Sequence, residues 1–324
     1  MSRLLNMAHF PDLKEKADVF STTGNSRQTH WSKEGRGFSM KRFEYYQPRT
    51  LDEAFERMGN LKGAGKYVAG GTDVIVRLKQ RALKVDALVS LRGIAGLGDI
   101  AHNGALSLGG CALFRDIERN EVIARDFPAL HQAVSMLANP QVRNVATIGG
   151  NLCNAAPSAD CAPPLLVMDA VITLEGPRGK RDVPIESFFK GPGATLVEAP
   201  EILTGITIPA ITPGTGSAFL KMGRVSQDIA KVNAAALVVM DGEVCLKCRL
   251  SAGAVAPVPL RLKACEKLVE GRRIDHDLLE EVALTASREV SPITDVRSTD
   301  DYRRHIAGVL AKRALGDALK FSTF

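Results

Sequence analysis

The sequence of 324 residues has few aromatic side chains and nearly balanced charge. Phe, Trp and Tyr make up only 5% of it, and no run of Lys and Arg reaches five residues. A nucleic-acid surface built on base stacking is therefore not expected. The 42 basic and 36 acidic side chains leave a net charge of +6, and 45% of the residues are hydrophobic, as in an ordinary globular protein.

Long apolar runs are also missing. The longest stretch without a charged residue, 202–220, is interrupted by Pro209, Pro213 and three glycines, which excludes a membrane span. The apolar residues near the start are too few for the core of an export signal. These absences favour a cytoplasmic protein, and the length predicts about two domains.

The six cysteines and six histidines show no pattern typical of a metal site or of a disulfide framework. The only CxxC pair, Cys245 and Cys248, lies in a segment that alternates like a strand. A period of two points the two sulfurs to opposite faces, so neither a shared metal nor a redox disulfide is expected there. We predict no metal site in the chain.

Composition and periodicity divide the chain into three parts. Residues 1–39 are polar and lack sustained periodicity, so they are expected to be a disordered or non-native extension. The second part, 40–215, is expected to hold two lobes of about 40–92 and 93–215. In the first lobe strands and helices alternate, and Thr50 is expected to cap the first helix. A Thr/Pro/Gly linker, 209–216, leads to the third part, 216–324.

Individual elements can be placed inside these parts. Strands are expected at 66–69, 87–91, 105–108, 170–174 and 202–208, and at 232–240 and 243–252, which flank an Asp-Gly turn. Helices are expected at about 74–82, 114–119, 128–138, 276–289 and 299–319.

Two double-glycine turns, Gly70-Gly71 and Gly149-Gly150, are candidates for ligand binding, because each is expected to follow an apolar strand. Paired glycines let backbone N–H groups approach an anion, and Thr72 is expected to cap the helix that follows the first pair. One such turn is usually plain turn chemistry, whereas two in neighbouring lobes could clamp both phosphates of a dinucleotide. Neither matches GxGxxG or GxxxxGK[ST], so a Rossmann site and a P-loop are disfavoured.

The segment 151–160, after the second turn, is small, polar and irregular. It is interpreted either as a plain loop or as the wall of a cofactor site. In the second interpretation its small residues let the backbone pack against a flat ligand, and Asp160 offers an acceptor for sugar hydroxyls.

Together these motifs resemble the medium, FAD-binding subunit of the molybdenum hydroxylases, the family of xanthine dehydrogenase and aerobic carbon monoxide dehydrogenase. The motifs that carry the resemblance are AGGTD at 69–73, TIGGNL at 147–152, NAAPSAD at 154–160, KMGR at 221–224, DIAKV at 228–232, and DVRS at 295–298 with Tyr302-Arg303. They follow the family's order from Met40 to the C-terminus.

The resemblance implies an α/β, two-lobed FAD-binding domain of the vanillyl-alcohol-oxidase type over 40–215. A small α+β domain with a three-stranded antiparallel sheet and helices follows over 216–324. It implies no catalytic residue and a cofactor bound by Val68, Ala69, Gly70, Gly71, Thr72, Asp73, Leu137, Thr147, Ile148, Gly149, Gly150, Asn151, Asn154, Ser158, Asp160, Leu203 and Lys221.

Roles within this set are also implied by the resemblance. Residues 68–73 and 147–151 would wrap the pyrophosphate, Leu137 would lie beside the adenine end, and Asp160 would be a polar anchor. Leu203 and Lys221 would lie beside the isoalloxazine ring, although composition alone favours a solvated surface lysine at 221.

Three departures from the broader fold family matter. Covalent flavoproteins carry a histidine in the first glycine turn, and this chain has Thr72-Asp73 there, so non-covalent FAD is expected. A related branch inserts a cysteine-bearing loop for an extra [4Fe–4S] cluster, but no insertion follows Cys153, which is expected to be a small packing residue. Residues 1–39 have no counterpart in the family.

The resemblance implies an electron-transfer subunit that works beside a large molybdopterin subunit and a small [2Fe–2S] subunit, as a dimer of heterotrimers. NAD⁺, a quinone and O₂ all remain open as the electron acceptor. One alternative is a stand-alone flavoenzyme like UDP-N-acetylmuramate dehydrogenase, but no matching Ser/Glu/Tyr set is recognisable. A scaffold that has lost its cofactor is disfavoured because both glycine pairs are intact.

Overall fold

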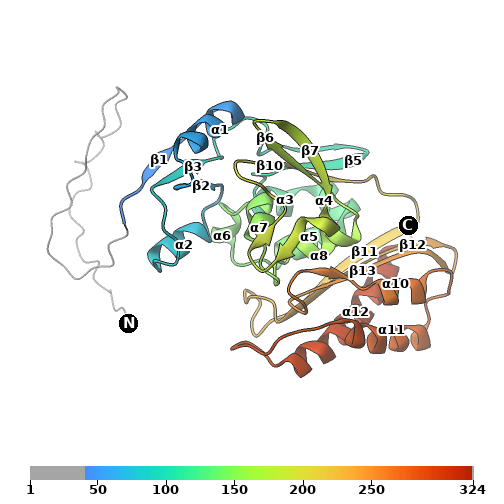
Figure 1. Ribbon diagram of the computed structural model, residues 1–324. Helices are drawn as coiled ribbons and strands as arrows, with labels where there is room; N and C mark the ends of the chain where they lie inside the picture. The colour runs from blue at the N-terminus through green and yellow to red at the C-terminus, as the bar shows by residue number, and fades with distance from the viewer. Residues whose placement is uncertain (1–40, 323–324) are drawn as a thin grey trace, which may run out of the picture. The chain divides into compact units, whose positions relative to one another are not determined.

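The computed structural model describes residues 41–322, so the extension expected over 1–39 lies outside the described residues. The first lobe holds a three-stranded parallel sheet in the order β1-β3-β2. Its elements are β1 (Glu44–Tyr46), α1 (Leu51–Asn60), β2 (Gly65–Val68), α2 (Val74–Lys79) and β3 (Ala87–Ser90) (Figure 1). The predicted alternation is confirmed, and the Thr50 hydroxyl caps α1 by accepting from Glu53 N–H at 3.2 Å.

The second lobe is built on a five-stranded antiparallel sheet in the order β4-β5-β10-β6-β7. Its strands are β4 (Ile100–Asn103), β5 (Ala105–Gly109), β6 (Val171–Gly176), β7 (Gly179–Pro184) and β10 (Ile202–Ile208), with a small pair β8 (Phe189–Gly191) and β9 (Ala194–Thr195). The helices are α3 (Phe114–Arg119), α4 (Glu121–Asp126), α5 (Pro128–Ser135), α6 (Pro140–Arg143), α7 (Ile148–Asn154), α8 (Ala162–Val167) and α9 (Ile185–Phe188).

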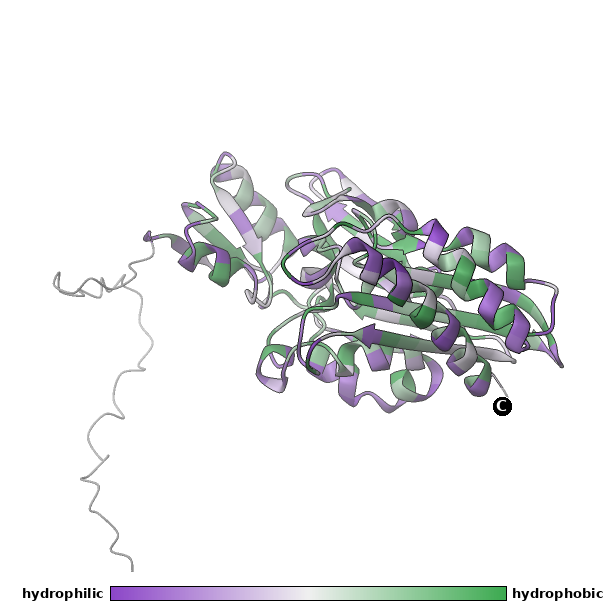
Figure 2. Cartoon of the chain, turned by 90° about the horizontal axis from the view of Figure 1, so that it is seen from below, coloured by the Kyte–Doolittle hydropathy of each residue, from purple (hydrophilic) through white to green (hydrophobic). Residues whose placement is uncertain are grey.

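The last part holds an antiparallel sheet in the order β11-β12-β13-β14. Three long strands, β11 (Thr215–Met222), β12 (Val232–Asp241) and β13 (Val244–Gly253), match the expected three-stranded sheet, and β14 (Leu260–Arg261) adds a two-residue edge. The helices are α10 (Lys263–Val269), α11 (His276–Glu289) and α12 (Asp300–Phe321). Apolar and polar residues alternate along these helices and strands (Figure 2), as expected for elements with one buried face.

One face of this last sheet packs against α11 and α12, and the other packs against the second lobe. Because side chains alternate along a strand, successive residues face these two cores in turn. Ala218 of β11 packs in the core with α11 and α12, whereas Phe219 packs in the core of the second lobe, where α5 also contacts β11. Lys221 shares the parity of Phe219, and its register partner Asn233 shares the parity of Ala235, another residue of the second-lobe core. Lys221 and Asn233 therefore face the second lobe.

The prediction that Cys245 and Cys248 point to opposite faces is wrong. The β12–β13 register shifts there, because Val239 pairs with Lys247 and Met240 with Cys245, so that Leu246 has no partner. This β-bulge inserts one extra residue and turns both sulfurs into the core, where both cysteines are fully buried.

Two further observations concern the described residues as a whole. None of the helices between residues 41 and 322 combines the length and the apolar character that crossing a membrane requires. Within the same range, no cluster of three or more His, Cys, Asp or Glu side chains is arranged to hold a metal ion.

Candidate cofactor site

The first glycine pair forms a tight connection between β2 and α2. A Cβ at Gly70 would overlap the carbonyl oxygen of Val145, so only glycine allows the two lobes to approach there. Gly71 has a φ of +73°, in the left-handed region that favours glycine. The backbone N–H groups of the four residues 70–73 donate no hydrogen bond to any described residue. Successive free N–H groups in such a turn form a concavity suited to an anion.

Thr72 does not cap α2, so that prediction is wrong. Asp73 occupies the N-cap position and its side chain makes no capping hydrogen bond. The Thr72 hydroxyl instead lies 3.5 Å from Asp73 Oδ2. Helix α2 begins at Val74, where the sequence pattern placed its start, and ends at Lys79, earlier than expected.

The second glycine pair lies in the first turn of a helix, and not in a turn after a strand as predicted. The same helix includes residues 151–154, so the prediction that the chain is irregular from 151 onward is wrong for these four residues. Helix α7 spans Ile148–Asn154, and Thr147 Oγ1 caps it by accepting from Gly150 N–H at 3.1 Å. The Gly149 N–H donates to Gly110 O at 3.0 Å, and the Asn151 N–H donates to Thr147 O at 3.0 Å. The N–H groups of this segment are thus already bonded within the chain.

Gly149 is glycine because of packing. A Cβ there would overlap the carbonyl oxygen of Gly110, and a Cβ at Gly110 would overlap that of Leu203. The three backbones therefore meet at one joint, which brings the predicted residues 149 and 203 together. Gly110 was missed in the sequence analysis, although it belongs to a third Gly-Gly pair, Gly109-Gly110, directly after the predicted strand 105–108.

A side-chain hydrogen bond connects the two glycine segments. Asn154 Nδ2 donates to Asp73 Oδ1 at 3.2 Å, which ties α7 to the first turn. These contacts connect residues 70–73, 149–151, 154 and 203 within the fold, while their common role in binding a cofactor stays a prediction.

Orphaned polar atoms mark the same place. Among the described residues, four buried side-chain atoms lack a hydrogen-bond partner: Asn151 Oδ1, Thr204 Oγ1, Asn233 Oδ1 and Arg303 Nε. Asn151 lies in the second glycine segment, and Thr204 adjoins Leu203 at the Gly110 joint. Because buried polar groups are normally paired, unpaired acceptors here indicate that the site is built to meet the donors of a bound molecule.

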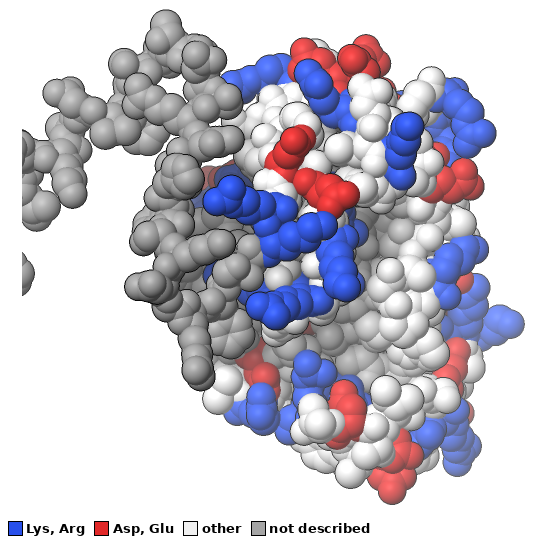
Figure 3. Space-filling view, turned by 60° about the vertical axis from the view of Figure 1, so that its left-hand side comes forward, with Lys and Arg blue, Asp and Glu red and all other residues white. Residues whose placement is uncertain are grey.

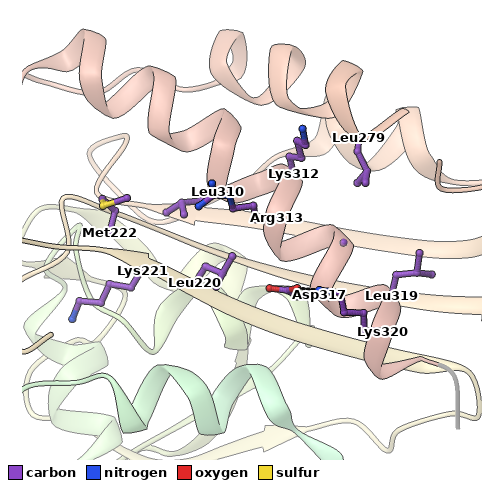
Figure 4. Close-up of a pocket in the computed structure, with 11 residues that line it drawn as sticks. Leu220, Lys221, Met222, Leu279, Leu310, Lys312, Arg313, Asp317, Leu319 and Lys320 are labelled. Carbon is purple, nitrogen blue, oxygen red and sulfur yellow. Dashed lines mark hydrogen bonds and ion pairs between the residues drawn. The ribbon is translucent and has the colours of Figure 1, made fainter. Parts of the chain in front are cut away.

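A buried ion pair forms the other part of the site. Lys221 Nζ lies 2.6 Å from Asp160 Oδ2, and the two side chains are only 5% and 7% exposed. Asn233 Nδ2 donates to Asp160 Oδ1 at 2.8 Å, and Lys221 Nζ lies 3.4 Å from Met136 O. Figure 4 shows the Lys221 side chain extending away from those of α12. The interpretation of Lys221 as a solvated surface lysine is therefore wrong.

Burial raises the pKa of Asp160, while the Lys221 ammonium and the two hydrogen bonds to the carboxylate oppose this rise. Asn233, which completes the group, was not predicted. A single polar residue in the otherwise apolar strand 232–240 was the available signal.

A cavity of about 390 Å³ adjoins this ion pair, with Met136, Ala138, Arg143, Lys221 and Val225 among its lining residues. A larger cavity of about 710 Å³ lies on the other side of β11, against α12 (Figure 4). Leu137, the predicted neighbour of the adenine, does not line the smaller cavity, and its side chain is buried in the core of the second lobe.

Several other residues predicted to bind the cofactor are buried or half-buried in the fold. Val68 and Ile148 are buried core residues, and so is Leu203. Ser158 is half-buried, and Ala69 is too. Cys153, which was expected to be a small packing residue, is exposed on α7, although its surroundings desolvate the thiol and raise its pKa to about 12.

The arrangement defines a class of protein that binds a phosphorylated organic cofactor. One part of the site offers free backbone donors suited to phosphates, and the other offers a buried cation suited to a polar ring edge. FAD fits both features, since it carries a pyrophosphate, hydroxyls that can donate to orphaned acceptors, and a ring with polar edges.

Comparisons with known proteins identify the family. Residues 41–211 match the family described as the FAD binding domain in molybdopterin dehydrogenase. Residues 217–318 match the CO dehydrogenase flavoprotein C-terminal domain. The xanthine dehydrogenase FAD-binding subunit of Escherichia coli O157:H7 is 33% identical over 279 residues, which cover 85% of this chain and 95% of that subunit.

Solved structures agree. A carbon monoxide dehydrogenase chain from Hydrogenophaga pseudoflava matches with a TM-score of 0.85 and 31% identity, covering 87% of this chain and 99% of that one. A chain of quinoline 2-oxidoreductase from Pseudomonas putida 86 matches with a TM-score of 0.83 and 26% identity, covering 88% and 100%. The chain belongs to the family of FAD-binding subunits of molybdenum hydroxylases.

Proposed function

We propose that this chain is the electron-transfer subunit of a molybdenum hydroxylase, passing electrons from a [2Fe–2S] subunit through bound FAD to an external acceptor. The observation that carries the proposal is the run of four free N–H groups at residues 70–73, at the joint between the two lobes. Bound FAD would supply the redox chemistry, because flavin takes up electrons singly and releases them in pairs. The chain itself would bind, orient and tune the cofactor.

Each part of the site has a proposed role. The N–H groups of 70–73 would hold the pyrophosphate, and α7 would supply a rigid wall whose Asn151 meets a cofactor donor. Lys221, oriented by Asp160, would lie at the isoalloxazine edge. No histidine stands in the first turn, so the FAD would be bound non-covalently. The FAD-binding part would be 40–215, with 216–324 closing the site through Lys221.

The molybdopterin and the [2Fe–2S] cluster would be held by a large and a small partner subunit. Relatives in this family include a carbon monoxide dehydrogenase medium chain, a name that implies larger and smaller companions. We propose a dimer of heterotrimers. All six cysteines are free thiols in the described structure, which supports a reducing compartment such as the cytoplasm.

The proposal is tested on the complex purified from its native source. Flavin absorbance, together with molybdenum and iron in the same particle by native mass spectrometry and metal analysis, is the expected result. Acid precipitation should release the flavin into the supernatant. A homo-oligomer with flavin but without molybdenum or iron would contradict the subunit function, and flavin that stays with the precipitate would contradict non-covalent binding.

A further inference from the structure

Arg303 is a buried cation outside the cofactor site described above. Lys and Arg side chains usually extend into solvent, as they do on the face of the molecule that Figure 3 turns forward. Arg303, near the start of α12, is only 4% exposed. Its Nη2 donates to Asp295 Oδ1 at 2.7 Å, and its Nη1 donates to two backbone carbonyl oxygens, Lys231 O at 2.7 Å and Ala254 O at 3.0 Å. The guanidinium therefore connects α12 to three other segments of the chain.

The two carbonyl groups lie at neighbouring strand ends. Lys231 directly precedes β12, and Ala254 directly follows β13. Close to both, Asn233 of β12 and Gly253 of β13 are register partners. Ala254 has a φ of +61°, a conformation that persists in a residue with a Cβ only where surrounding contacts hold the backbone. The Arg303 guanidinium supplies one such contact, at the end of the sheet that carries Asn233.

Contacts continue from this strand end to the buried ion pair. Asn233 is fully buried, and its Nδ2 donates to Asp160 Oδ1, while the other oxygen of Asp160 is bonded to Lys221. Asn233 Oδ1 has no hydrogen-bond partner in the described part of the chain. A Cβ at Gly253 would overlap this oxygen, so the amide lies directly against the backbone of β13. Because the amide makes a single hydrogen bond there, its position depends on the strand ends.

A purely local role does not account for the contacts of Arg303. Helix α12 is already capped by the Thr299 hydroxyl. The segment before it is closed by its own bonds, because Asp295 Oδ1 accepts from the N–H groups of Arg297 and Ser298, at 2.9 and 3.2 Å. Arg303 Nε is buried without a partner among the described residues, which costs stability. What the guanidinium adds is the connection to the two strand ends.

We propose that Arg303 is a positioning residue of the cofactor site: by holding the ends of β12 and β13, it fixes Asn233 and, through it, the buried ion pair. The inference rests on the function proposed above, in which Lys221 lies at the edge of the isoalloxazine ring. Burial raises the pKa of Asp160, and the hydrogen bond from Asn233 is one of the interactions that oppose this rise. A displaced strand end would weaken that bond, and a less constrained carboxylate would hold the Lys221 ammonium less firmly.

The experiment compares substitutions at two adjacent arginines of the full-length chain. Arg303→Met removes the guanidinium from the strand ends, and Arg303→Lys keeps the charge but replaces a planar fork of donors by a single nitrogen. Arg304→Met is the matched control, because Arg304 Nη1 also donates to two carbonyl oxygens, Ser287 O at 3.2 Å and Val290 O at 2.7 Å, at the end of α11. Both methionine variants should lower the midpoint of thermal unfolding.

The midpoint potential of the bound flavin distinguishes the two positions. Arg303→Lys should lower this potential and Arg303→Met should lower it further, whereas Arg304→Met should leave it unchanged. The effect of Arg303 should disappear in a chain that carries Lys221→Met together with Asp160→Asn, because no ion pair remains to be positioned. A merely structural role would lower the stability in both backgrounds and change the potential in neither.

The outcomes separate this inference from the proposed function. If the unaltered chain binds no FAD, the proposed function fails, and the inference fails with it. If the unaltered chain binds FAD and the Arg303 variants keep its potential, the positioning role alone is overturned. An Arg303 effect of equal size in the chain without the ion pair would also overturn it, as would an equal shift caused by Arg304→Met. Where a methionine variant does not fold, Arg303→Lys and Arg304→Lys make the same comparison.

Discussion

The two parts of the cofactor site differ in whether their polar groups are already hydrogen-bonded within the chain. At the first glycine turn, four successive N–H groups are left without an acceptor in the described chain. At the Lys221 part, the ammonium is bonded to Asp160, whose second oxygen is bonded to Asn233. The first arrangement keeps its binding capacity for a ligand, whereas the second fixes a charge in place before any ligand arrives. In the proposed function, binding and tuning of the cofactor therefore fall to different residues.

The two glycine pairs also differ in whether the N–H groups around them are bonded. Gly70-Gly71 leaves donors free, but the donors around Gly149-Gly150 are all bonded within the chain. The second pair is needed because backbones meet at Gly110. In the proposed function the same dipeptide therefore serves ligand binding at the first pair, whereas it serves close packing at the second.

The largest expected effect is at the ion pair. Lys221→Met should lower the free energy of unfolding by about 3–5 kcal/mol, because it leaves Asp160 buried without its cation. Chemical denaturation measures this loss. Lys41→Met is the control, since the Lys41–Asp86 pair is largely exposed and should contribute less than about 1 kcal/mol.

The same variant tests the tuning role. The flavin midpoint potential should fall by about 30–60 mV, because a charged hydrogen bond contributes roughly 1.5–3 kcal/mol and reduced flavin carries more negative charge. Adding Asp160→Asn should recover most of the stability but not the potential. An unchanged potential at full FAD occupancy would leave Lys221 with a structural role only.

Gly149→Val should mainly lower the stability of the folded chain. Its side chain would overlap Gly110, and overpacking of this kind costs about 1–3 kcal/mol. Thermal unfolding of the apoprotein measures the loss. Gly59→Ala in α1, where a Cβ meets nothing within 4 Å, should not destabilise the chain. Unchanged stability of Gly149→Val would disprove the packing role of the second pair.

Gly71→Val should mainly weaken the binding of FAD. The Cβ has room, so the apoprotein should lose only about 1–2 kcal/mol from the left-handed φ. Reorientation of the neighbouring N–H groups should weaken FAD binding by at least about tenfold, measured by titration of the apoprotein. Gly71→Asn, which tolerates this φ, should retain more affinity. Full occupancy in the valine variant would contradict the anion-binding role.

The smallest expected effect is on stability at acid pH, and it involves Glu118, whose partner Arg143 lines the smaller cavity beside Lys221. Burial alone would raise the pKa of Glu118, but hydrogen bonds from Arg143 and Arg115 outweigh it and hold this pKa below its ordinary range. A lowered carboxyl pKa contributes stability above the unfolded value of about 4.3, and this is lost as pH falls through the folded pKa.

Glu118→Gln should therefore reduce the loss of stability below about pH 4.3, by roughly 1 kcal/mol. Arg143 also donates to Leu137 O at 2.9 Å, so the same variant should loosen the wall of the smaller cavity. Denaturation curves at a series of pH values measure the difference, and parallel pH profiles for both chains would refute the role of Glu118.

Periodicity and turn chemistry were enough to place individual elements, whereas the two-lobed domain and the three-stranded sheet were implied by the family resemblance. The helices 114–119 and 276–289 and the strand 202–208 were placed at the residues where the structure has them. The errors arose where tertiary contacts override local preference. Two adjacent glycines disfavour a helix, yet α7 forms because Gly149 must approach Gly110. The β-bulge at Leu246, which depends on pairing with β12, left no local signal.

For the site, motifs identified the segments but not the bonds between them. The sequence does not show that Lys221 and Asp160 pair, because they are sixty-one residues apart and meet only when β11 packs on the second lobe. Asn233 and Gly110 were missed for the same reason. The first turn was predictable in more detail, since its donors and its two glycines lie within four consecutive residues.

The central claim is that the N–H groups of residues 70–73 are kept free for the cofactor. Amide hydrogen exchange of the apoprotein, with and without added FAD, tests it most directly. FAD should strongly slow exchange at residues 70–73, while residues 149–151, already bonded within the chain, should exchange slowly in both states. Unchanged exchange at 70–73 in protein saturated with FAD would contradict the claim.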